Sequence, residues 1–128
     1  MPDTPAARKL LIKPGFAVLL VNPPQNVKDL LGEVPEGVNL TEYLDGLADL
    51  ILFFASSQKE LEFHTAGLTK RLEPDGLFWI AYAKGTSKLK TDINRDSIRA
   101  YVPACGLQTV ALVALNDDWA AMRCKKIL

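Results

Sequence analysis

Short apolar runs separated by polar turns organise the chain. Residues 16–21, 50–54 and 77–83 are three uninterrupted apolar runs of strand length. Runs of this kind are typical of strands buried on both faces, as in a parallel sheet covered by helices. Residues 108–115 form a further apolar stretch, so the pattern predicts at least four strands.

Helix signals lie between these runs. Ser57 and Glu60 have the spacing of a capping box, which predicts that a helix begins after Ser57. Lys70 and Arg71 fall in its expected last turn, where positive charge suits the helix dipole. The face that would lie on the sheet recurs at helical spacing: Leu61, Thr65, Leu68 and Leu72. Residues 73–76 then supply turn chemistry.

Three further segments complete the pattern. Residues 25–31 predict a short helix ending at Gly32, and residues 38–40 a brief strand. Asn94 is placed to cap a helix over 95–102, which Pro103 should end or kink. From residue 119, apolar and basic side chains alternate, which predicts a half-exposed antiparallel edge strand.

The order of these elements predicts the fold class. Strands alternate with helices and end in a hairpin-like pair, which favours a small three-layer Rossmann-like α/β sandwich. Its sheet should be mostly parallel with an antiparallel C-terminal strand. A chain of 128 residues is long enough for one domain with a real core. We expect a flexible N-terminal lead over 1–9 and a single domain over 10–128.

Composition excludes several function classes. Lysine plus arginine equals aspartate plus glutamate at 15 each, which argues against a nucleic-acid-binding protein. The N-terminus lacks the pattern of a secretory signal, and every apolar run is too short to cross a bilayer, so we expect no membrane partner and a cytoplasmic location. Cys105 and Cys124 stand without a CxxC pair or a cysteine–histidine cluster, so we expect two buried free thiols and no metal.

Two segments carry a family resemblance. Residues 11–20, from Leu11 to Leu20, resemble the entry to the first strand of class I S-adenosylmethionine methyltransferases. Residues 72–80 resemble the proline- and glycine-containing turn before a later strand of that fold, and the antiparallel last strand also fits. Over most of residues 10–126 the chain resembles a group of small bacterial proteins of unknown function, with a lysine at Lys84 and a tryptophan at Trp119. The resemblance implies a degenerate methyltransferase-like fold and implies no particular function.

The turn after the first strand departs from the methyltransferase pattern. Methyltransferases use a glycine-rich turn there against the amino-acid part of the cofactor, whereas residues 22–27 read Asn-Pro-Pro-Gln-Asn-Val. Proline has no N–H and restricts the residue before it, so this turn removes donors where the cofactor needs them. We therefore predict no cofactor and no cofactor-binding residues. Glu42 and Asp45 are candidate ribose partners, but without a cofactor turn we interpret them as solvated loop acids.

No catalytic residue emerges from the motifs. Asn22-Pro23-Pro24 resembles part of a motif of amine-directed methyltransferases, but it follows the first strand, and Gln25 replaces the aromatic residue. We interpret the triplet as a rigid turn. His64 lies in mid-helix with no nucleophile beside it, and neither a GxSxG elbow nor a P-loop occurs.

Open α/β sheets bind ligands at the carboxyl ends of their strands, and those ends give the candidate ligand-binding residues. They are Asn22, Ser56, Ser57, Lys84, Thr86 and Ser87. Lys84 with Lys88 and Lys90 makes a cationic loop that would attract a small anion, although lysines that simply solvate a loop fit the pattern better. Trp119 is a candidate partner-binding residue, with a core position in the final hairpin favoured over it.

Three functional hypotheses follow. The leading one is a non-enzymatic methyltransferase-like domain that binds a small ligand, anionic if the lysines hold it, or a protein partner. The second is an enzyme with a divergent site around Lys84 and Ser87. The third is an assembly or regulatory module that uses an edge strand at 123–127 or the surface around Trp119. The sequence leaves self-association open.

Overall fold

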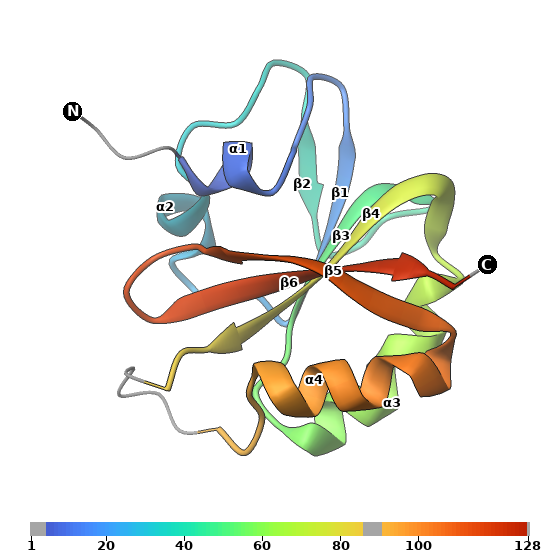
Figure 1. The fold of residues 1–128 in the computed structure, drawn as a ribbon. Coiled ribbons are helices and arrows are strands. Elements are labelled where there is room, and N and C mark those ends of the chain that lie inside the picture. Colours follow the sequence, from blue (N-terminus) through green and yellow to red (C-terminus); the bar gives the residue numbers. More distant parts are fainter. Residues whose placement is uncertain (1–4, 86–90, 128) are drawn as a thin grey trace.

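The computed structural model describes residues 5–85 and 91–127, and it contains one six-stranded sheet. The strand order is β2-β1-β3-β4-β6-β5 (Figure 1). Strands β1 to β4 run parallel, and β6 is antiparallel to both of its neighbours, β4 and β5. The strands are β1 (Ala17–Val21), β2 (Asn39–Thr41), β3 (Ala48–Phe54), β4 (Leu72–Ala83), β5 (Leu107–Ala114) and β6 (Trp119–Lys126).

Helices cover both faces of the sheet and make three layers (Figure 1). One face carries α3 (Gln58–Thr69), α4 (Arg95–Tyr101) and the following 3-10 turn η1 (Val102–Cys105). The other carries the shorter helices α1 (Ala6–Lys9) and α2 (Val27–Leu31). The predicted small three-layer α/β sandwich, mostly parallel with an antiparallel C-terminal strand, is confirmed.

Alternation along the central strands divides the core into two clusters. On β3, Ile51 and Phe53 pack under α3 and α4, whereas Leu50, Leu52 and Phe54 pack under α1 and α2. All five side chains are buried. The uninterrupted apolar runs therefore have the expected cause, because neither face of these strands meets water.

The boundary between α3 and β4 differs from the prediction. Helix α3 ends at Thr69, and Leu72 already belongs to β4, so the predicted turn over 73–76 is an irregularity inside a strand. The register passes from Ala48 opposite Leu72 to Leu50 opposite Leu77. Arg71 does not cap the helix, and its guanidinium instead donates to the carbonyl oxygens of Leu44 and Gly46.

The position of β6 also corrects the prediction. It is antiparallel as expected, but it lies between β4 and β5 rather than at the edge of the sheet. The two edge strands of the sheet are β2 and β5. The alternation of apolar and basic residues in β6 identified a strand with two unlike faces, and such a pattern carries no information on which strands lie beside it.

The packed part of the chain begins before residue 10. Ala6 and Ala7 of α1 are buried, and the indole Nε1 of Trp79 donates to the Leu10 carbonyl at 3.0 Å. In the described ranges no helix is long and apolar enough to cross a membrane. Of the two free thiols, Cys124 is buried as expected, whereas Cys105 is only half-buried.

Candidate functional site

The carboxyl ends of three adjacent parallel strands bring three of the predicted residues to one edge of the sheet. Asn22 follows β1, Ser56 lies two residues after β3, and Lys84 follows β4. Ser57 continues from Ser56 as the N-cap of α3. Thr86 and Ser87 lie outside the described residues.

The turn after β1 has few donors to offer. Asn22 takes a left-handed conformation with φ of +53°, which asparagine tolerates better than most residues other than glycine. Pro23 and Pro24 have no N–H, and the N–H of Val27 donates back to the Pro24 carbonyl at 3.1 Å. The predicted rigid turn is therefore present, and its backbone has little capacity to hold a polar ligand.

The N-terminus of α3 is occupied by the protein's own side chains. The Oγ of Ser57 accepts the N–H of Glu60 at 3.1 Å. The Glu60 carboxylate accepts both the N–H of Ser56 at 2.9 Å and its hydroxyl at 2.6 Å. Ser56 and Ser57 are thus engaged in capping, and Glu60 turns to Ser56 rather than to the N-cap backbone that a capping box would use.

A second carboxylate closes the same helix end. Asp92 Oδ1 accepts the N–H of Gln58 at 2.6 Å, and the hydroxyl of Thr91 donates to the Ser56 carbonyl at 2.9 Å. A helix N-terminus ordinarily attracts anions, but here two carboxylates already take its donors and would repel another negative charge. The sequence analysis did not identify Thr91 and Asp92 as part of this site, because no local pattern links them to residues more than thirty positions earlier.

Lys84 lies farther along the same edge of the sheet, away from the N-terminus of α3. It lines a hollow of about 570 Å³ formed by residues of β4, β5, β6 and α4. Its walls combine apolar side chains with two cations, Lys84 and Arg95, and they contain no carboxylate. The lining residues are Tyr82, Lys84, Gly85, Asn94, Arg95, Leu112, Val113, Ala114 and Ala120. This hollow is the strongest candidate site in the described part of the chain.

Local hydrogen bonds place the two cations. The N–H of Lys84 donates to the Asp118 carbonyl at 2.8 Å, which ties the end of β4 to the turn between β5 and β6. Arg95 is the first residue of α4, whose start is fixed by a capping box between Asn94 and Ser97. The sequence predicted that cap, but it did not predict that the cap faces the end of β5, so Arg95 was missed.

Tyr82 adds a phenol to the hollow. Burial raises the pKa of Tyr82 above its usual 10.0, the nearby Asp96 carboxylate adds to the rise, and the Arg95 and Arg99 charges only partly oppose it. The phenol therefore stays protonated near neutral pH and can donate a hydrogen bond. A lining that combines a neutral hydroxyl, two cations and apolar side chains suits a small molecule with one anionic end.

Trp119 and His64 both pack against aromatic rings of the protein. Trp119 is half-buried and packs edge-to-face on Phe54, with ring centroids 5.1 Å apart. His64 is half-buried on α3 in edge contacts with Phe53 and Phe63. Among the described residues no group of three or more His, Cys, Asp or Glu side chains is placed to hold a metal ion.

Comparison with solved structures places the fold among the methyltransferases. A ribosomal protein L11 methylase from Lactobacillus delbrueckii subsp. bulgaricus superposes with a TM-score of 0.62 at 12% identity, over 96% of this chain and 75% of that one. A TehB-like S-adenosylmethionine-dependent methyltransferase from Corynebacterium glutamicum gives 0.59 at 12%, over 97% and 89%. A glycopeptide N-methyltransferase gives 0.57 at 12%, over 94% and 88%.

These similarities concern the fold alone, because identities this low do not transfer an activity. No protein-family model and no curated protein matches the chain. The chain therefore has a methyltransferase-like Rossmann fold.

Proposed function

We propose that this chain is a ligand-binding domain on a methyltransferase-like fold, that it does not transfer methyl groups, and that it holds a small anionic molecule in the hollow beside Lys84. The observation that carries the proposal is the contrast between two places at the same edge of the sheet. After β1 and β3 the backbone donors are missing or already bonded within the protein, whereas after β4 two cations, Lys84 and Arg95, line a hollow.

The turn after β1 bears on whether the chain can bind the methyl donor. S-adenosylmethionine carries an amino-acid end that methyltransferases hold against the turn after the first strand. Here that turn contains Pro23 and Pro24, and the neighbouring helix end is filled by Glu60 and Asp92. The residues present do not fit the cofactor, because two residues of the turn after β1 have no N–H and the donors of the adjacent helix end are taken by Glu60 and Asp92.

The lining of the hollow beside Lys84 indicates what kind of ligand it would bind. Lys84 and Arg95 supply positive charge, Tyr82 supplies a neutral hydroxyl, and Leu112, Val113 and Ala120 supply apolar contact. Charge-assisted hydrogen bonds in a partly apolar setting are stronger than those in open water. An amphipathic anion, with a carboxylate, sulfonate or phosphate on a hydrocarbon or aromatic body, matches this lining.

Anilinonaphthalene sulfonate tests the proposal, because this probe combines a sulfonate with aromatic rings and fluoresces in apolar surroundings. We expect saturable binding to the folded chain, weakened about tenfold by Lys84→Ala or Arg95→Ala, since each removes one charge contact. Lys59→Ala on the exposed side of α3 is the matched control and should leave the affinity unchanged.

Circular dichroism of each variant confirms that it is folded. The proposal fails if the folded wild type gives no saturable signal, or if Lys84→Ala and Arg95→Ala bind the probe as well as Lys59→Ala does.

A further inference from the structure

Strand β5 is an open edge with the properties of a docking site. It ends the sheet, so one side of its backbone pairs with β6, and on the other side residues 5–85 and 91–127 supply no neighbouring strand. Val110 and Leu112 are 43% and 44% exposed, although both are large and apolar. Long edge strands that expose apolar side chains commonly add a strand from another chain.

The hydrogen-bond phase along β5 shows which backbone groups face outward. The N–H of Leu115 donates to the Trp119 carbonyl within the hairpin, whereas the Ala114 carbonyl accepts the Nζ of Lys9 at 3.1 Å on the outer side. Because this direction alternates along an antiparallel strand, the backbone of Leu112 also faces outward. A bulge at Val110 interrupts the register with β6 just before that point.

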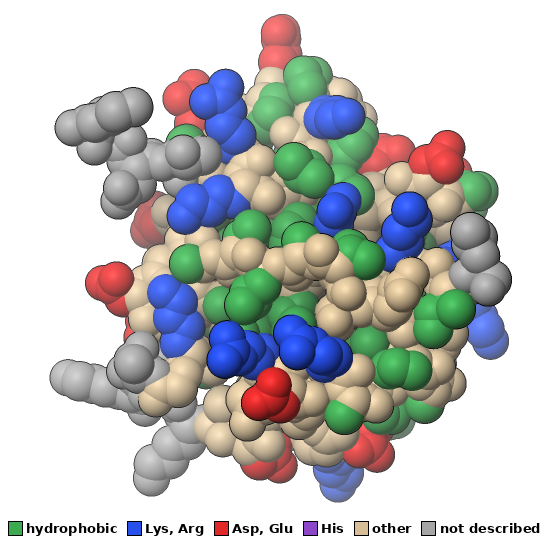
Figure 2. All heavy atoms as spheres, in the orientation of Figure 1, with side chains coloured by type: hydrophobic (Ala, Val, Ile, Leu, Met, Phe, Trp, Pro, Cys, Tyr) green, Lys and Arg blue, Asp and Glu red, His purple; other side chains and the backbone are tan. Residues whose placement is uncertain are grey.

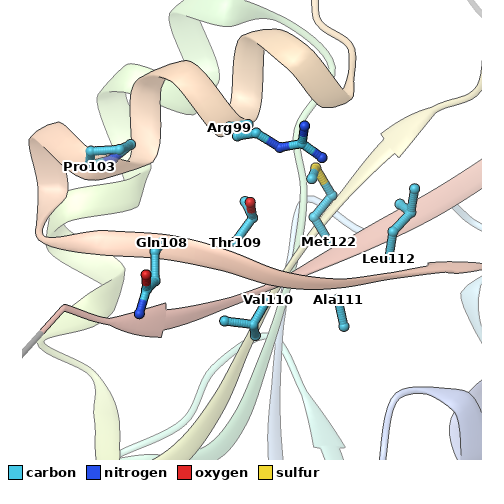
Figure 3. A pocket seen from close by; sticks show the side chains of 8 residues that line it. All are labelled: Arg99, Pro103, Gln108, Thr109, Val110, Ala111, Leu112 and Met122. Atoms are coloured by element: carbon cyan, nitrogen blue, oxygen red, sulfur yellow. The ribbon is translucent and has the colours of Figure 1, made fainter.

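A groove accompanies this edge on the side of α4. It has a volume of about 490 Å³ and is bounded by Arg99 and Pro103 above and by Thr109 and Leu112 of β5, with Met122 at its base. Figure 3 shows Arg99 reaching from α4 toward this side of β5, while Val110 and Ala111 point away from it. Leu112 is shared with the hollow that contains Lys84.

Charge on both sides of the edge selects the occupant. Arg99 lies on the α4 side, and Arg123, opposite Ala111, lies on the other face, where its Nε is buried without a hydrogen-bond partner. The basic residues of α4, β5 and β6 are Arg95, Arg99, Arg123, Lys125 and Lys126, against the single acidic residue Asp96. Figure 2 shows Lys and Arg side chains gathered across this face around apolar ones, although the whole chain is neutral.

We propose that β5 and the groove beside Arg99 bind an extended acidic segment of a partner protein, which adds to the sheet as a further strand. Alternate side chains of an added strand point to opposite faces, so acidic ones would meet Arg99 on one face and Arg123 on the other. Apolar ones would cover Val110 and Leu112. The match is therefore a segment in which acidic and apolar residues are interspersed.

Two other occupants fit less well. A second copy of this chain paired through β5 would place like-charged arginines from both copies along one seam, since a two-fold interface uses the same patch twice. A nucleic acid would satisfy the charges but would leave the exposed apolar side chains and the outward backbone groups without matching contacts.

The test uses an acetylated octapeptide in which pairs of glutamates alternate with pairs of valines, so that each face of the added strand carries both residue types. The peptide is titrated into the isotope-labelled full chain while backbone amide resonances are followed by NMR. We expect shifts centred on residues 108–114. Arg99→Glu should weaken binding at least about tenfold, since it replaces an attraction by a repulsion. Lys59→Glu, an equal charge change on exposed α3, should change it by less than about twofold.

Two comparisons separate strand addition from general anion binding. A peptide N-methylated at alternate residues should lose binding, because it cannot pair with the edge. The proposal is overturned if that peptide binds like its parent, if Arg99→Glu binds like the wild type, or if the octapeptide causes no shifts in β5. It is also overturned if polyphosphate, a DNA oligonucleotide or phosphatidylserine vesicles shift the same amides more strongly than the octapeptide. Because Lys84→Ala should spare this interaction, its result is independent of the ligand proposed for the hollow.

Discussion

Trp79 shows how one residue joins sequence-distant parts of this fold. It is the largest fully buried side chain, it lies on β4, and its indole donates to the carbonyl of Leu10 just after α1. The apolar run over 77–83 predicted that Trp79 would be buried. It did not predict the partner, because the two residues are far apart in the chain and a buried indole N–H can donate to any suitably placed carbonyl.

Trp79→Phe should therefore destabilise the fold by about 1–3 kcal/mol, since it leaves the Leu10 carbonyl buried without its donor. Trp119→Phe is the matched control, because Trp119 is half-buried and an aromatic ring on Phe54 is retained. Urea unfolding followed by circular dichroism measures both variants. Equal losses for the two would show that the Trp79 hydrogen bond contributes nothing.

At the candidate site, too, some residues could be predicted from the sequence and others could not. Ser57 was predictable as a cap because its partner lies three residues ahead. Asp92 at the same helix end and Arg95 in the hollow were not, because each reaches its place through packing between elements that are distant in sequence.

Helix starts are the elements that the sequence predicted best. Asn94 and Ser97 form a complete capping box at the start of α4, with the Asn94 side chain accepting the Ser97 N–H at 3.0 Å. Asn26 also occupies an N-cap, that of α2, but its side chain makes no capping hydrogen bond. The same residue type therefore has different roles in the two helices.

Asn94→Ala should lower the free energy of unfolding by about 1 kcal/mol, as the loss of an N-cap usually does. Asn26→Ala should change it by less than about 0.5 kcal/mol, in the range of surface substitutions. Chemical denaturation of both variants under one set of conditions makes the comparison. A larger loss for Asn26→Ala would contradict the assignment of α4 as the capped helix.

The order of the strands in the sheet could not be predicted from the sequence. Each strand was identified by its own pattern, but the insertion of β6 between β4 and β5 is a non-local choice. A helix cap can be recognised in a single sequence, because its residues lie within a few positions of one another. The order of strands in a sheet cannot, because it depends on packing between segments that are far apart in the chain. The docking surface proposed on β5 could therefore not be predicted from the sequence, since it depends on β5 being an edge strand.

For the whole molecule, the burial of Cys124 makes stability depend on pH. Burial raises the pKa of the Cys124 thiol to about 12 from its usual 9.0, with Cys105 adding to the effect. In the unfolded chain the thiol ionises near 9.0, so the native state binds the extra proton between these values. The stabilising contribution is complete below pH 9 and is lost as the pH rises toward 12.

The free energy of unfolding of the wild type should therefore fall more steeply than that of Cys124→Ala as the pH is raised above 9. Urea titrations of both proteins at about pH 8, 9 and 10, which bracket the usual thiol pKa, measure how steeply each free energy of unfolding changes with pH. The variant also loses packing, which lowers its stability at every pH without changing the slope. Parallel slopes would show that Cys124 titrates alike in the folded and unfolded chain.

The whole molecule has a methyltransferase-like fold, and we propose that it does not bind the methyl donor of that fold. Calorimetric titration of S-adenosylmethionine and of its demethylated product into the full chain tests this claim most directly. We predict no saturable heat with either compound at millimolar concentration. Micromolar binding of either one that is weakened by substitutions at residues 22–26 would contradict the account.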